Sequence, residues 1–418
     1  MPKIKSLSAL QIFDSRGTPT VQVFLETTSG KISGACVPSG ASKGKNEAFE
    51  LRDGGKDFFG KGVSKAISNV EGEIFGALVG KNIFDQKEID ETLINLDGTE
   101  NKSRLGANAI LGVSIANLKA AAQEKNLEVF EYLNPAEKII PTPFINMING
   151  GAHADNNCGV QEFMIIPKGF KTFSKAIRAS AEIFFQLKNI LKNKNLSTNV
   201  GDEGGFAPEL NSNEEAIELL LFAIEKSGYK PGEEVFLGLD VAANELEKNG
   251  NISLLKKNSC TISKKDLIEK YEEWVKKYPI ISLEDPLPES DWEDWQALTK
   301  KLKNIQIVGD DIFVTQTKKL QKGIENNSAN SILIKPNQVG TITETLDAIS
   351  LAKKNNFKTI ISHRSGDTED AFIADFAVGT SAMQIKTGSL SRSERVAKYN
   401  RLLHIEKILG EKVHYIDY

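Results

Sequence analysis

The sequence predicts an α/β protein in which a closed (β/α)8 barrel of the TIM type follows a smaller N-terminal α+β domain. In the second half of the chain, apolar runs of strand length recur, and each stops at a titratable side chain. After Glu284 these stops are 23 to 28 residues apart, which leaves room for a crossover helix before the next parallel strand. The runs do not alternate with polar residues, as is typical of parallel strands covered by helices. The charged strand ends are Asp240, Glu284, Asp310, Lys335, His363 and Lys386.

A closed barrel explains these charged ends better than an open doubly wound sheet does. A barrel builds its site from the carboxyl ends of several strands, whereas an open sheet binds its ligand mainly at one switch point. A barrel takes about 250 residues. The chain has 418, so a second, smaller domain is expected.

The N-terminal part is expected to contain strands followed by helices. Strand-like runs between residues 4 and 37 surround a turn at residues 28–31, which predicts an antiparallel meander. Proline residues between 135 and 143 mark the domain boundary, which we place between domains 1–138 and 139–418. The segments predicted to be helical are 63–80, 86–96 and 108–123.

The second domain is expected to open with two strands, 144–153 and 161–167, that form a hairpin pair. An amphipathic segment at 172–191 follows. Ser212 and Glu215 then form a capping box that begins another helix. The strand at 280–284 must stop before Pro286 and Pro288, because proline cannot donate to a sheet ladder.

The composition excludes several classes of protein. Hydrophobic content of 40%, charged content of 26% and a net charge of −4 are ordinary, and they give no sign of a nucleic-acid-binding domain. Cys36, Cys158 and Cys260 lack CxxC spacing, which speaks against a disulfide framework or a structural zinc site. No apolar stretch approaches the ~18 residues of a membrane span, and no apolar leader segment follows Met1. We therefore expect a cytoplasmic protein.

Three neighbouring strand ends carry carboxylates, at Asp240, Glu284 and Asp310. Any one of them alone would be read as a helix cap or a solvated loop charge. Three in one cleft repel one another unless a cation neutralises them, and oxygen ligands suit Mg²⁺. The pattern therefore predicts a magnesium site.

Lys335 is a candidate general base. A lysine with an ordinary pKa is a poor base at neutral pH, but Lys386, Arg364 and a metal ion in the same cleft would lower that pKa. The alternative for either lysine is a structural ion pair with one of the carboxylates.

Two further groups suit proton transfer and anion binding. Glu203 lies on a glycine-rich loop, and Glu162 is its natural partner, since facing carboxylates can share a proton when the pKa of one is raised. The segment 363–366 contains a histidine, an arginine and a serine, which suit a phosphate or a carboxylate, and His153 could join them.

Taken with these residues, the chain resembles the enolase family, in its bacterial type, from about residue 4 to about residue 404. This resemblance implies an enolase-like barrel with a capping domain and the reversible, Mg²⁺-dependent dehydration of 2-phospho-D-glycerate to phosphoenolpyruvate in glycolysis. It rests on the segments 14–21, 38–42, 106–111, 161–164, 201–205, 282–286, 309–311, 335–338, 362–366 and 384–388, which follow the family order.

The resemblance also assigns roles to residues. Lys335 would remove the C2 proton, and Glu203, supported by Glu162, would protonate the departing hydroxyl. Two Mg²⁺ ions are implied, and the second arrives with the substrate. The implied ligands of the first ion are Asp240, Glu284 and Asp310, with Ser42 for the second, and the implied substrate-binding residues are His153, Gln161, His363, Arg364, Ser365 and Lys386.

As partners, the resemblance implies the small-molecule substrate and a homodimer or octamer, and it leaves room for a second binding role at the cell surface. Two alternatives remain: another dehydratase or cycloisomerase of the same superfamily, and a non-catalytic scaffold. The chain departs from the family pattern at Pro336 and at 241–247, where no atom has an assigned catalytic role.

Overall fold

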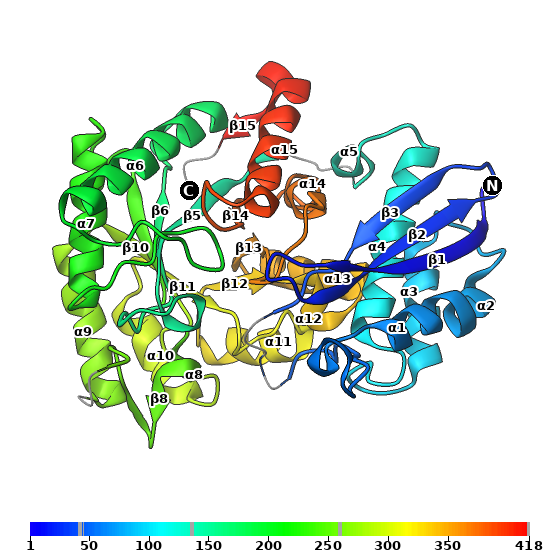
Figure 1. The fold of residues 1–418 in the computed structure, drawn as a ribbon, viewed down its shortest axis with the longest axis horizontal. Coiled ribbons are helices and arrows are strands. Elements are labelled where there is room, and N and C mark those ends of the chain that lie inside the picture. The colour runs from blue at the N-terminus through cyan, green and yellow to red at the C-terminus, as the bar shows by residue number, and fades with distance from the viewer. Residues whose placement is uncertain (41–43, 45, 134–137, 258–260, 416–418) are drawn as a thin grey trace.

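The computed structural model describes residues 1–40, 44, 46–133, 138–257 and 261–415. An N-terminal sheet with its helices lies beside a barrel that is surrounded by helices (Figure 1). Among the described residues, no helix is both long enough and apolar enough to cross a membrane.

The N-terminal strands form the predicted antiparallel meander. The strands β1 (Ile4–Phe13), β2 (Pro19–Thr27) and β3 (Ile32–Cys36) pair in chain order. The helix α4 (Ala107–Glu124) packs on β2 and β3, and Gly112 allows this close approach, because a Cβ there would lie 2.5 Å from Val23 Cγ2. The other helical segments are η1 (Asp57–Gly60), α1 (Ser64–Asn69), η2 (Val70–Ile74), α2 (Phe75–Leu78), α3 (Gln86–Asp97) and α5 (Val129–Tyr132).

The barrel closes with eight strands, as predicted. All neighbouring pairs are parallel except those made by the second strand, which runs antiparallel to both neighbours and forms the expected hairpin with the first. In chain order the strands are β5 (Thr142–Asn149), β6 (Glu162–Ile166), β7 (Phe236–Asp240), β10 (Ile280–Glu284), β11 (Gln306–Gly309), β12 (Ser331–Ile334), β13 (Lys358–Ser362) and β14 (Gln384–Lys386).

The barrel strands are apolar on both faces. Inward side chains form a small separate cluster, while the residues next to them in sequence join the large core beneath the helices. This explains why the strands do not alternate between polar and apolar residues. The inner cluster consists of Phe144, Met164, Ile166, Val308, Leu333 and Ile360.

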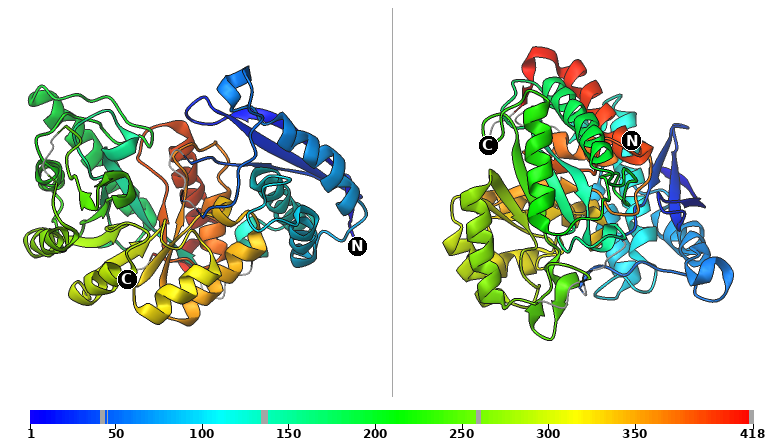
Figure 2. Two further views of the ribbon diagram at one scale, coloured as in Figure 1. Left: turned by 90° about the horizontal axis from the view of Figure 1, so that it is seen from below. Right: turned by 60° about the vertical axis from the view of Figure 1, so that its left-hand side comes forward.

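Helices cover the outside of the barrel (Figure 2). Two of the predicted helix starts are confirmed, because Thr172 and Ser212 accept hydrogen bonds from the backbone of the first helical turn that follows. The principal helices are α6 (Phe173–Asn193), α7 (Asn213–Lys226), α9 (Lys264–Lys277), α10 (Trp292–Lys301), α11 (Thr317–Asn326), α13 (Ile342–Lys354), α14 (Phe372–Gly379) and α15 (Ser393–Leu409). Short elements are β4 (Ile139–Ile140), η3 (Gly151–His153), α8 (Ala243–Leu246), β8 (Glu247–Lys248), β9 (Asn251–Ile252), α12 (Pro336–Val339), η4 (Gly410–Lys412) and β15 (His414–Tyr415).

The N-terminal part reaches the carboxyl ends of the barrel strands. Ser39 and Gly366 exchange two backbone hydrogen bonds, at 2.7 and 2.8 Å, after the ends of β3 and β13. The backbone N–H of Ser15 donates to the carbonyl of Asp367 at 2.8 Å. These contacts place residues from the first fifty of the chain at the mouth of the barrel.

Gly309 and Gly323 make room for the ring of Phe313 behind the end of β11. A Cβ on Gly323 would lie 2.3 Å from Phe313 Cε1, whereas a Cβ on the exposed helical Gly76 would meet nothing within 4 Å. We expect Gly323→Ala to lower the free energy of unfolding by about 1–3 kcal/mol through overpacking. The matched variant Gly76→Ala should raise it by about 0.4–1 kcal/mol. Thermal unfolding of the two variants checks this, and equal midpoints would contradict it.

Candidate active site

The six charged strand ends lie together at the mouth of the barrel. Asp240, Glu284 and Lys386 are the last residues of β7, β10 and β14. Asp310, Lys335 and His363 directly follow β11, β12 and β13. Five of these side chains and several loop residues line one cavity, and Glu284 lies beside it, bound to Lys386. The predicted residues that line the cavity are His153, Gln161, Glu162, Glu203, Asp240, Asp310, Lys335, His363, Arg364, Ser365 and Lys386.

Lys386 holds the carboxylates of three strands. Its Nζ lies 2.8 Å from Asp240 Oδ2, 2.8 Å from Glu284 Oε1 and 3.1 Å from Glu162 Oε1, and the side chain is buried. Burial alone would lower the pKa of Lys386, but these carboxylates outweigh it and hold the pKa well above its ordinary value. Lys386 is therefore a fixed positive charge in the cavity.

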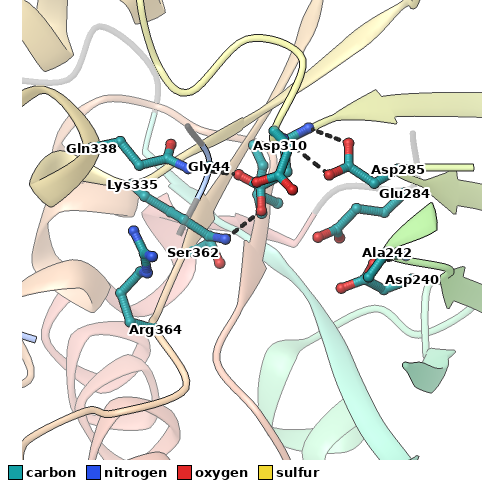
Figure 3. Close-up of polar contacts among 12 residues, drawn as sticks. Gly44, Asp240, Ala242, Glu284, Asp285, Asp310, Lys335, Gln338, Ser362 and Arg364 are labelled. Carbon is teal, nitrogen blue, oxygen red and sulfur yellow. Dashed lines mark hydrogen bonds and ion pairs between the residues drawn. The ribbon is translucent and has the colours of Figure 1, made fainter. Parts of the chain in front are cut away.

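Lys335 forms an ion pair with Asp310 (Figure 3). Burial lowers the pKa of Lys335 and Asp310 raises it, and the net pKa lies above the ordinary value. The prediction of a lowered pKa included a metal ion in the cleft, and the side chains by themselves do not lower the pKa of Lys335. Arg364 and Lys386 do lower this pKa, as anticipated, but the direct contact with Asp310 is stronger.

Asp310 is held by partners that the sequence analysis missed. Gln338 Nε2 donates to Asp310 Oδ1 at 2.8 Å, and the carboxylate of Asp285 accepts the backbone N–H groups of Asp310 and Asp311 at 2.8 and 2.9 Å (Figure 3). Asp285 itself has a φ of +40°, which places strain directly after the β10 strand end. The only sequence signal for it is its position between Glu284 and Pro286.

The carboxylate cluster fits a divalent cation. Burial and repulsion from Asp240 and Asp310 raise the pKa of Glu284 well above its ordinary value, so a cation beside these carboxylates would favour the charged form of Glu284. The donors are all oxygens, as Mg²⁺ prefers. Figure 3 shows Asp240, Glu284 and Asp310 directed toward a common space.

The predicted metal triad is nevertheless less compact than expected. Within the described ranges, two other sets of three side chains have metal-ligand atoms that all lie within 4.8 Å of one another. Between Asp240 and Glu284 lies Lys386, which contacts both. Ser42, the predicted ligand of a second ion, falls outside the described residues. The two compact groups are His153–Glu162–Glu203 and Asp285–Asp310–Asp311.

Glu162 and Glu203 form a buried carboxylate pair, as predicted. His153 Nδ1 lies 3.6 Å from an oxygen of each, and His363 Nε2 lies 3.3 Å from Glu203 Oε1. Burial and the charge of Glu203 raise the pKa of Glu162 well above its ordinary value. Burial would do the same to Glu203, but His363 and His153 outweigh it and the pKa of Glu203 is well below its ordinary value.

These opposite directions mean that Glu162 takes up a proton more readily than Glu203 does. The expectation of one raised pKa is met by Glu162, whereas His363, 3.3 Å from Glu203 Oε1, and His153, equally distant from both carboxylates, lower the pKa of Glu203. Asn146 Nδ2 also donates to Glu203 Oε2 at 3.3 Å, a contact that the sequence analysis missed.

Arg364 has an unpredicted partner from the N-terminal part. Its Nη1 lies 2.9 Å from Glu47 Oε2 and its Nη2 lies 3.2 Å from Glu47 Oε1, so the two groups form a two-pronged ion pair. Asn337 Oδ1 accepts a further bond from Nη1 at 3.1 Å. The guanidinium is thus held at the cavity by the carboxylate of Glu47.

The departure at Pro336 is accommodated locally. Pro336 is the first residue of α12, a position where proline costs no hydrogen bond, and the backbone N–H of Lys335 donates to Thr315 Oγ1 at 2.9 Å. The segment after Asp240 forms α8, from which Asn244 Nδ2 donates to Asp311 Oδ2 at 2.8 Å.

Comparison with protein-family models agrees with this architecture. The family model described as "Enolase, N-terminal domain" matches residues 4–133, and the model described as "Enolase, C-terminal TIM barrel domain" matches residues 137–417. Together they cover nearly the whole chain, in the order in which the sheet and the barrel occur. Such domains indicate an enzyme of the lyase type. The chain therefore belongs to the enolase family.

Proposed function

We propose that this chain catalyses the reversible dehydration of 2-phospho-D-glycerate to phosphoenolpyruvate and water. The observation that carries the proposal is that Lys335 and the pair Glu162–Glu203 line one cavity with a buried acidic cluster. A β-elimination of water next to a carboxylate needs a base, an acid and a way to stabilise negative charge. The cavity supplies a residue for each of these needs.

Lys335 is the base that removes the C2 proton. It gains basicity when Asp310 no longer pairs with it, because Arg364 and Lys386 both lower its pKa. Loss of the proton creates additional negative charge on the substrate carboxylate, and the fixed ammonium of Lys386 faces this charge. Bound Mg²⁺, held by Asp240, Glu284 and Asp310, would supply further positive charge at the same place.

Glu203 delivers a proton to the departing C3 hydroxyl. Glu162, whose pKa is raised, lies within the same group and can therefore hold a proton that resupplies Glu203. Arg364 and Ser365 bind the phosphate, and His153, Gln161 and His363 line the pocket. The guanidinium of Arg364 suits a phosphate group, and its partner Glu47 could be displaced by one. This favours a phosphorylated substrate over the substrates of another dehydratase or a cycloisomerase of the superfamily.

The remaining assignments are part of the same proposal. We infer two Mg²⁺ ions per site, the second bound with the substrate by Ser42, and the bacterial type of the family. The protein would act as a homodimer or octamer in the cytoplasm, with a secondary binding role at the cell surface still open to test. A non-catalytic scaffold is the competing function, and retention of Lys335, Glu203 and all three carboxylates speaks against it.

Replacing the base should abolish the reaction. We expect Lys335→Ala to lower kcat by about 10²–10⁴-fold, the usual contribution of a positioned general base. Absorbance at 240 nm, followed as the protein meets 2-phosphoglycerate and Mg²⁺, measures this. Lys354→Ala removes an exposed lysine at the end of α13 and should leave the rate unchanged. An active Lys335→Ala variant would rule out this base, and an inactive wild type would support the scaffold function.

Removing the metal should stop turnover reversibly. We expect EDTA to abolish the absorbance change and added Mg²⁺ to restore it, since the buried acidic cluster needs a hard cation. Titration calorimetry should show that Glu284→Gln weakens Mg²⁺ binding by at least about tenfold, or ~1.4 kcal/mol. Glu293→Gln, an exposed carboxylate change on α10, is the control. Equal Mg²⁺ affinities of the two variants would exclude Glu284 as a ligand.

Neutralising Glu47 should favour anion binding. Glu47→Gln removes the negative charge that competes with a phosphate for Arg364. We expect KM for 2-phosphoglycerate to fall by roughly tenfold, the effect of ~1.4 kcal/mol. Steady-state kinetics with Glu100→Gln, an exposed carboxylate change, as the control would measure the difference. A KM that rises in the Glu47 variant would instead assign Glu47 to orienting Arg364.

A further inference from the structure

The imidazole of His363 is held from both sides. Its Nδ1 lies 2.5 Å from Nη1 of Arg395, and its Nε2 lies 3.3 Å from Glu203 Oε1. The backbone N–H of His363 donates to the carbonyl of Lys386 at 3.0 Å, and the residue is only 2% exposed. The ring therefore bridges a guanidinium and the proposed acid.

The chemistry of the guanidinium decides where the ring proton lies. Arginine has only N–H donors, has no acceptor and keeps its charge at every relevant pH. Its contact with Nδ1 therefore requires a lone pair on Nδ1. A neutral imidazole with an acceptor at Nδ1 carries its proton on Nε2, which is the nitrogen that faces Glu203.

The surroundings also oppose a doubly protonated ring. Burial, which is the largest cause, and the charge of Arg395 lower the pKa of His363 to about 4, although Glu203 and Asp367 act in the opposite direction. A second proton would place an imidazolium directly against a buried guanidinium. The ring is thus neutral at pH 7.

Arg395 is itself rigidly placed. It lies on α15 with no exposed surface. Its Nη1 donates to the carbonyl of Arg364 at 2.6 Å, and its Nη2 donates to the carbonyls of Ser365 at 2.6 Å and Asp202 at 3.2 Å. Gly388 leaves space for this side chain, because a Cβ there would lie 2.7 Å from Arg395 Cδ. Arg395 therefore ties the loop that carries Glu203 to the loop that carries His363.

We propose that Arg395 is a positioning residue that holds His363 as the neutral Nε2–H tautomer, so that the imidazole presents an N–H, and not a lone pair, to Glu203 Oε1, which lies 3.3 Å away. The other tautomer would direct a lone pair at the carboxylate. A neutral donor orients Glu203 without adding net charge to the cavity. The effect on catalysis rests on the proposed function, in which Glu203 transfers the proton. The assignment of the His363 tautomer does not depend on that function.

The tautomer can be measured directly in the full chain. The sequence has only four histidines, so ¹⁵N labelling of histidine gives few signals, and His363→Gln assigns the relevant pair. At neutral pH we expect His363 to show an unprotonated Nδ1 and a protonated Nε2. A protonated Nδ1, in either a neutral or a charged ring, overturns the proposal, and this experiment needs no variant of Arg395.

Two substitutions of Arg395 separate positioning from packing. Arg395→Lys offers only donors, so it should keep the tautomer. Arg395→Gln brings an acceptor oxygen that can accept from Nδ1–H, so it should shift the ring toward the Nδ1–H form and lower kcat by about 10–100-fold with a smaller change in KM. Arg401→Gln, on the same helix but bound to Asp375 and Glu128, is the matched control.

The outcomes distinguish this inference from the proposed function. A kcat that falls in Arg395→Gln while the tautomer stays unchanged overturns the positioning role. A tautomer that shifts in Arg395→Gln and stays in Arg395→Lys supports it. A wild-type protein with no activity toward 2-phosphoglycerate removes the proposed function, but the ¹⁵N spectra of the wild type and the variants still decide the role of Arg395.

Discussion

The balance of buried charge at the mouth of the barrel is the constraint on which the rest of the site depends. Three strand ends bring carboxylates into a space that water barely reaches, and an uncompensated buried charge costs several kcal/mol. Lys386 and Lys335 compensate them in this structure through direct ion pairs. The same ion pairs are therefore a structural element of the barrel mouth, and a divalent cation bound by these carboxylates would change the partners of both lysines.

The N-terminal part completes this mouth and is not merely attached to the barrel. The paired backbone of Ser39 and Gly366 lies next to Arg364, and Glu47 binds the guanidinium of Arg364. Arg392 binds the backbone carbonyl of Ser15, so α15 joins the same arrangement from the opposite end of the chain. Segments that are more than 300 residues apart in sequence thus set the position of the residues proposed to hold the phosphate.

The sequence predicted the residue types of the site better than their protonation states. Parallel strands end at the same edge of a barrel, so Asp240, Glu284 and Asp310 could be placed together from spacing alone. Their neighbours within 3 Å could not, because side-chain contacts depend on rotamers and on loops from distant parts of the chain. For this reason the ion pair between Lys335 and Asp310, and the assignment of the raised pKa to Glu162, became evident only in the folded structure.

The sequence by itself determined the order of the elements, the closed barrel, the meander and the set of charged strand ends. These follow from local patterns: apolar runs, crossover spacing, caps and prolines. The tertiary structure alone decided which charges touch. Glu47 contacts Arg364, which is 317 residues away in sequence, and Arg395 contacts His363, which is 32 residues away. No local sequence pattern predicts either contact. Electrostatic interactions inside a protein depend on distance and burial, and both are properties of the folded chain.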